Sequence, residues 1–192
     1  MALFPLGILS AAGGGAAAGD YELIQTQIVS GTSTSSVVFS NLGNFSTTYK
    51  HLQVRLVARA GRALQNEPLY MSFNGVGGTS YATHAIAGNG SGFFVEGTAN
   101  LSSIERVGII AGSTAEANNF GATVIDILDA FSTTKNKTTR ALGGVAPASG
   151  PIVGLYSGLF NSTASITSIT FTNFSATAFV ANSRFSLYGI RG

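Results

Sequence analysis

The sequence is a series of short runs of β-branched and aromatic residues, separated by Gly, Asn and Ser. In HLQVRLVAR (51–59), Leu52, Val54, Leu56 and Ala58 alternate with His, Gln, Arg and Val residues. Strict alternation indicates a strand with one face in the core and the other face towards solvent or a partner. Helical periodicity is almost absent from the rest of the chain, so this rhythm restricts the fold to the all-β class.

Turn-forming residues separate the runs at regular intervals. The other predicted strands are YELIQTQIV, SVVFSNL, PLYMSF, YATHAI, SGFFVE, SIERVGII, FGATVIDIL, KTTRALGG, PIVGLYSGLF, ITSITFTNF and SRFSLYGI. NGVGG after PLYMSF predicts a tight hairpin turn, and STAEANNF or the end of IDILDAF could form one helical turn. Many short strands at this spacing predict an antiparallel β-sandwich, jelly-roll-like, in a single domain over residues 21–192.

Residues 1–20, MALFPLGILSAAGGGAAAGD, differ in composition from the rest of the chain. A secretory signal needs a basic start, which is absent here, and Pro5 and Gly7 interrupt an apolar run that is too short to span a bilayer. We therefore predict a retained arm rather than a signal peptide. The apolar side chains expected to pack against other subunits are Leu3, Phe4, Pro5, Leu6, Ile8 and Leu9.

Charge is scarce, because only 9% of the residues are Asp, Glu, Lys or Arg and the formal net charge is +2. Soluble proteins typically contain about 25% charged residues, and charge is depleted at the centre of protein contacts. The composition therefore favours a protein that functions within an assembly. The basic residues are scattered, so nucleic-acid binding is not expected, and no cysteine is present to form a disulfide or bind metal.

Few residues could support catalysis, and no catalytic, cofactor-binding or metal-binding residue is predicted. Within residues 21–192, Asp126 and Asp129 are the only close pair of carboxylates, and on a strand they would face opposite sides, whereas on a helical turn they could share a proton or a metal. His51 and His84 have no acidic neighbour in the sequence. The glycines of GNGSG (88–92) precede no helix that would complete a phosphate site, so a flexible loop is expected.

Exposed aromatic rings could bind sugars, although core packing explains most of these residues more simply. The candidates are Tyr70, Tyr81, Phe93, Phe94, Tyr156 and Phe160. Phe93 and Phe94 are adjacent, so on a strand they cannot both face one core. We expect one of the two to contact a neighbouring subunit or a glycan.

Several segments together resemble a known group of proteins: PLGIL followed by a Gly/Ala run, YELIQT, YKHLQVRLVAR, FGATVIDILDAF and the closing SRFSLYGI. The chain resembles short structural proteins of tailed bacteriophages, many of which infect aquatic and cyanobacterial hosts. The similarity covers nearly the whole chain, but its motifs are strand-sized patches that carry no active-site residue. The resemblance implies a role in the virion.

The expected function is therefore a non-enzymatic virion protein that associates with itself, as a trimer, and docks through its arm as a tail or neck appendage. A capsid decoration or cement protein is the alternative, and a carbohydrate-binding module that recognises host glycans is a further one. A glycan depolymerase is the least favoured reading. The expected partners are further copies of the chain, capsid, neck or tail proteins and a host surface glycan, with assembly in the host cytoplasm.

Overall fold

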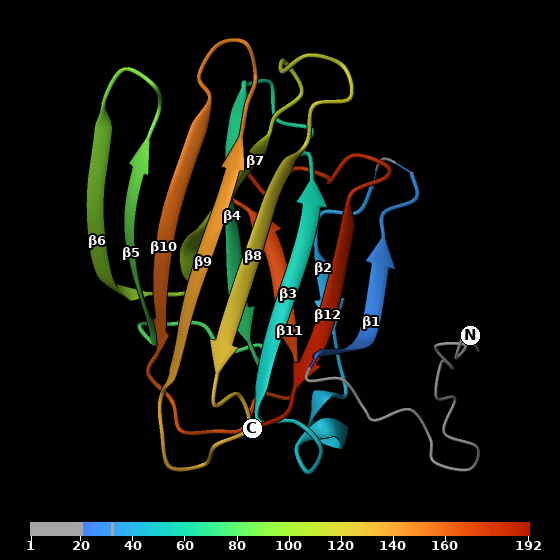
Figure 1. Ribbon diagram of the computed structural model, residues 1–192, viewed down its shortest axis with the longest axis vertical. Helices are drawn as coiled ribbons and strands as arrows, with labels where there is room; N and C mark the ends of the chain where they lie inside the picture. Colours follow the sequence, from blue (N-terminus) through green and yellow to red (C-terminus); the bar gives the residue numbers. More distant parts are fainter. Residues whose placement is uncertain (1–20, 32) are drawn as a thin grey trace, which may run out of the picture.

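A computed structural model describes residues 21–31 and 33–192. The predicted arm at residues 1–20 lies outside the described residues, together with its six apolar candidates Leu3, Phe4, Pro5, Leu6, Ile8 and Leu9. The described part is all-β and folds into two antiparallel sheets that pack against each other (Figure 1). The predicted β-sandwich is confirmed.

The eight-stranded sheet contains β1 (Tyr21–Ile28), β12 (Arg184–Ile190), β3 (His51–Ala58), β8 (Gly121–Leu128), β9 (Lys137–Val145), β10 (Ile152–Phe160), β5 (Tyr81–Gly88) and β6 (Phe93–Leu101), in this spatial order. The four-stranded sheet contains β2 (Val37–Phe39), β11 (Ile169–Asn173), β4 (Asn66–Phe73) and β7 (Ile104–Ala111). A short 3₁₀ helix, η1 (Leu42–Phe45), follows β2.

Eight of the strands have the order of a jelly roll. The order β1-β12-β3-β8 in one sheet faces β2-β11-β4-β7 in the other, so that successive strands of this set alternate between the sheets, except that β4 and β7 pair with each other in one sheet. The remaining strands, β5, β6, β9 and β10, form two hairpins inserted between jelly-roll strands. Because β10 pairs with β5, the two hairpins join and extend the first sheet beyond β8 (Figure 1). We call these four strands the inserted strands.

Aromatic rings fill much of the space between the sheets. Tyr81 and Phe160 stack with their ring centroids 4.9 Å apart, and Phe73 packs on Phe160 at 5.5 Å. Phe171 and Phe185 meet from opposite sheets at 5.4 Å. Burial of such side chains is the main source of stability in a sandwich of this type.

Three sequence expectations about connections are corrected by the structure. Asn74 and Gly75 do adopt positive φ angles, 56° and 66°, which are close to the value of about 57° that is typical of the left-handed region. However, NGVGG links β4 to β5, which belong to different sheets, so it is not a hairpin turn. STAEANNF and the residues after Leu128 form turns and not helices.

Arg59 is the last residue of the alternating run HLQVRLVAR (51–59), and the alternation predicts it on the outer face with Arg55 and Val57, but it is buried. Its guanidinium donates hydrogen bonds to the backbone oxygens of Ser113, Ala115, Glu116 and Asn119, at 2.7–3.2 Å. Arginine has five N–H donors in a fixed geometry, which suits it to several carbonyl groups at once. Arg59 therefore holds the β7–β8 connection in place.

Candidate assembly surface

Strand β10 has an unusual distribution of side-chain sizes. In IVGLYSGLF, Gly154 and Gly158 point into the sandwich and are buried, whereas Val153, Leu155 and Leu159 point outwards. A Cβ atom at position 158 would lie 2.5 Å from Cγ2 of Ile104 on β7, so the tight approach of the two sheets requires glycine there. The strand thus has glycine at two core-facing positions, which alternate with the buried rings of Tyr156 and Phe160, and it has large apolar residues towards solvent.

The neighbouring inserted strands show the same pattern. On β9, Ala141 is buried and Leu142 is 57% exposed, and on β5, Ala85 is buried and Ile86 is 52% exposed. Leu155, also 57% exposed, lies directly opposite Leu142 on one side and Ile86 on the other. The pairing therefore brings large apolar side chains into one row.

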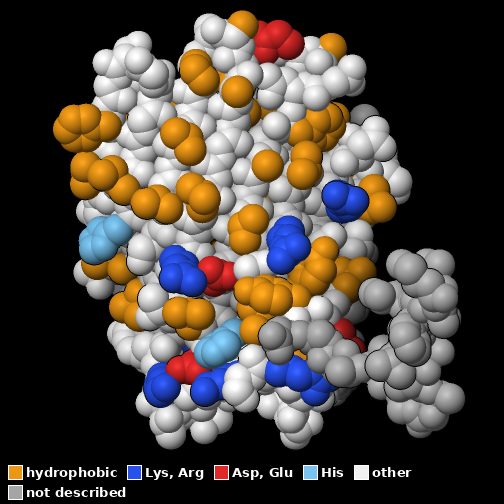
Figure 2. All heavy atoms as spheres, viewed as in Figure 1, with side chains coloured by type: hydrophobic (Ala, Val, Ile, Leu, Met, Phe, Trp, Pro, Cys, Tyr) orange, Lys and Arg blue, Asp and Glu red, His pale blue; other side chains and the backbone are white. Residues whose placement is uncertain are grey.

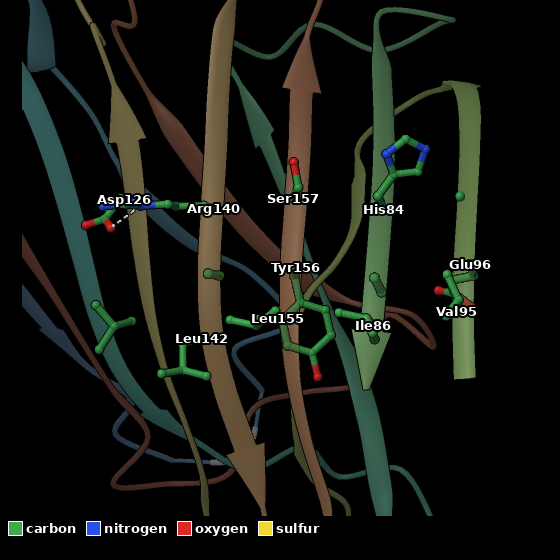
Figure 3. A pocket seen from close by; sticks show the side chains of 14 residues that line it. His84, Ile86, Val95, Glu96, Asp126, Arg140, Leu142, Leu155, Tyr156 and Ser157 are labelled. Carbon is green, nitrogen blue, oxygen red and sulfur yellow. Dashed lines mark hydrogen bonds and ion pairs between the residues drawn. The ribbon is translucent and has the colours of Figure 1, made fainter. Parts of the chain in front are cut away.

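This row crosses five strands of the sheet without interruption. In spatial order it contains Val95, Ile86, Leu155, Leu142 and Val124, each paired with the next across adjacent strands. We call these five residues the apolar row. They line an open hollow of about 1060 Å³ on the outer face of the eight-stranded sheet (Figure 3). Figure 2 shows apolar side chains spread widely over the same face.

A strip of polar side chains runs beside the apolar row, two residues further along the strands. Asp126 accepts hydrogen bonds from Nε of Arg140, at 3.0 Å, and from Nε2 of Gln53, at 2.7 Å. Gln53 in turn accepts from Nε of Arg55, at 2.7 Å. The guanidinium carbon of Arg55 also lies 4.8 Å from the centre of the Tyr188 ring. The carboxylate at the centre of the face is thus paired within the same chain.

The two adjacent phenylalanines of β6 face opposite sides. Phe93, at the start of the strand, is 80% exposed on the outer face. Phe94 is partly buried against the core, and the guanidinium carbon of Arg106 lies 5.3 Å from its ring centre. Phe93 is therefore the member of the pair that is available for a contact, and the contact itself remains a prediction.

The other aromatic candidates do not offer an outer platform for sugars. Tyr81, Tyr156 and Phe160 are buried, and Tyr70 is partly buried beside Phe174. Burial raises the pKa of Tyr156 to about 12. Its hydroxyl has no hydrogen-bond partner among the residues that the structure describes. At these four aromatic residues the structure agrees with the interpretation that they pack in the core.

Asp126 and Asp129 lie in separate environments. Asp129 follows β8 and adopts a positive φ of 47°. Its carboxylate accepts a hydrogen bond from Nζ of Lys135 at 2.7 Å, which holds its pKa below the ordinary value. The two carboxylates therefore have different cationic partners, Arg140 and Lys135, and form no joint acid–base site.

The fold brings His51 close to Asp129, which its sequence neighbours did not indicate. The two side chains approach to 3.7 Å, and the backbone N–H of Asp129 donates to Nδ1 of His51 at 2.8 Å. In a catalytic triad, Nδ1 carries a proton and donates it to the carboxylate. Here Nδ1 accepts a hydrogen bond, so the contact does not form a triad. It joins the start of β3 to the residue that follows β8.

His84 and the GNGSG segment lie on or near the same face. His84 is exposed at the border of the hollow. GNGSG forms the β5–β6 turn, in which Asn89 Oδ1 accepts hydrogen bonds from the backbone N–H groups of Ser91 and Gly92. Within residues 21–31 and 33–192, no three His, Asp or Glu side chains are grouped as metal ligands. No helix in this part of the chain is long and apolar enough to cross a membrane.

No protein-family model matches the chain, and no curated protein is significantly similar to it. The apolar row was not recognised from the sequence, because alternation identifies two faces without saying which one is buried. The signal that could have revealed it is the repeated combination of glycine or alanine with leucine or isoleucine in β10, β9 and β5.

Proposed function

We propose that this chain is a non-enzymatic structural subunit of a tailed-phage virion. It associates with further copies of itself and docks on the particle through residues 1–20, as a tail or neck appendage. We expect three copies about one axis, because a cyclic arrangement can bury the same surface of every subunit.

The observation that supports this proposal is the outward apolar surface of the inserted strands. The jelly roll is complete without these strands, yet they carry large exposed apolar side chains such as Leu142, Val153 and Leu155. An apolar patch of this kind on a soluble protein usually marks a contact with another macromolecule. The low charge content and the resemblance to phage structural proteins support the same reading.

Purified particles of the phage that encodes the chain provide the test. After banding in a density gradient and a high-salt wash, peptides of this protein should be found in the particle fraction by mass spectrometry. A host enzyme of similar abundance serves as the control for carry-over. If the chain remains with the soluble proteins while known tail and capsid proteins band together, the virion proposal is wrong.

Phe93 gives a specific reason to keep glycan recognition as a second candidate function. Its ring is 80% exposed next to the β5–β6 turn, and exposed aromatic rings can stack on sugars. A glycan array that includes host polysaccharides, probed with the full chain and with F93A, tests this function. Binding that F93A abolishes would support it, and equal signals from both proteins would exclude Phe93 as a glycan platform.

A further inference from the structure

We infer that the outer face of the eight-stranded sheet, centred on the apolar row, is the surface through which copies of this chain bind each other. The inference rests on the self-association in the proposed function and identifies the surface responsible for it. The occupant of the apolar hollow is thus the folded part of a second copy.

The exposure of the large apolar side chains follows from the register of the strands. Shifting β10 by one residue would turn Leu155 inwards and the glycines outwards, because side chains alternate strictly along a strand. The sheet spacing opposes this shift, since glycine is needed beneath β7 at position 158. Leu142 and Ile86 repeat the arrangement on both neighbours of β10. Three adjacent strands therefore present large apolar side chains in one plane.

The charges on the face favour a second copy over a strongly charged partner. Asp126 is already paired with Arg140 and Gln53, so a covering surface need not supply a counter-charge for it. Apolar and polar rows also alternate on the face, so that it can pack against an equivalent face. About the proposed three-fold axis, one part of the face on each copy would meet a different part of the face on the next copy, with apolar rows against apolar rows and polar groups against the paired polar strip.

The size of the face also suits a copy-to-copy contact. Eight strands about 4.8 Å apart, with about eight residues rising about 3.4 Å each, give a face of roughly 1000 Å². A standard protein interface buries about 800 Å² on each partner. Contact over most of the face would therefore be large enough for a stable oligomer.

Sedimentation velocity of the full chain over a wide concentration range tests the inference. The wild type should sediment as an oligomer, and L142K/L155K as a monomer, with its dissociation constant raised by about 100-fold or more. V38K is the matched control, because Val38 is an exposed strand valine on the outer face of the other sheet. It should associate like the wild type. L142T/L155T, which retains strand-forming residues, replaces the lysine variant if that variant does not fold.

Three results would overturn the inference. The first is a wild type that stays monomeric at all concentrations, and the second is a folded double variant that associates as strongly as the wild type. The third is complete dissociation on deleting residues 1–20, which would mean that the arm, and not this face, holds the copies together. None of these results would show that the protein is absent from the virion. The proposed function is tested separately, by looking for the protein in the particle fraction.

Discussion

Arg140 on β9 and Asp126 on β8 form an ion pair across adjacent strands, with Nε and Oδ2 3.0 Å apart, beside a row of exposed apolar side chains. The Arg140 side chain is 72% exposed in the single chain, whereas that of Asp126 is only 21% exposed. The stabilisation that the ion pair contributes therefore depends on whether another molecule covers the face. In water it is a surface ion pair, and within an interface it would neutralise a carboxylate that has lost contact with solvent.

Replacing Arg140 with leucine should separate these two situations. The free energy of unfolding of the monomer should fall by less than about 1 kcal/mol, because exposed ion pairs contribute little. Self-association should weaken by about 2 kcal/mol or more, because covering the face would bury Asp126 with its strongest partner missing. Chemical denaturation at low concentration and sedimentation velocity measure the two quantities. K135L, which removes an ion pair at the end of the sheet, should leave association unchanged.

Tyr81 and Tyr156 should respond in opposite ways to replacement by phenylalanine. The Tyr81 hydroxyl accepts from the backbone N–H of Phe73 at 2.9 Å and lies 3.1 Å from the backbone oxygens of Phe73 and Val76. Y81F should therefore lower the free energy of unfolding by about 1–3 kcal/mol, because it leaves buried polar groups unpaired. Y156F should leave it unchanged or raise it by up to about 1 kcal/mol. A large loss of stability in Y156F would show that the hydroxyl has a partner in solution.

Asp129 should make stability depend on acidic pH. The hydrogen bond from Lys135 lowers the pKa of Asp129 in the folded protein below its ordinary value of 3.8. The resulting stabilisation is fully present above pH 3.8 and is lost as the pH falls through the lowered pKa. In K135M the pKa of Asp129, followed by NMR, should rise towards its ordinary value. K50M is the control, because Lys50 has the weaker influence on this carboxyl.

Removing residues 1–19 should separate folding from incorporation into particles. The described domain has its own core, so the truncated chain should retain the circular dichroism spectrum and cooperative unfolding of a β-sandwich. It should no longer enter particles when it is the only copy expressed during infection. F4D/L6D should behave in the same way, because it would bury unpaired charge at the docking contact. Normal incorporation of both variants would show that the arm is not the docking element.

The strand pattern predicted the fold well, because alternation and turn residues are local properties of the sequence. The NGVGG turn was assigned to a hairpin because a tight turn does not reveal whether the next strand joins the same sheet. Arg59 was expected outside because its carbonyl partners come from a connection more than fifty residues away. The outward position of Leu142 and Leu155 was missed for a related reason. The tight packing that requires glycine in β10 depends on β7, which is distant in the sequence.

The number of copies per particle tests the account most directly. It can be measured by quantitative mass spectrometry of purified virions, with the major capsid protein as the internal standard. A tail or neck appendage predicts a count at least about ten times lower than that of the capsid protein, and a trimer predicts a multiple of three. A count similar to that of the capsid protein would contradict the appendage and indicate a decoration protein. Absence from the particles would contradict the structural role itself.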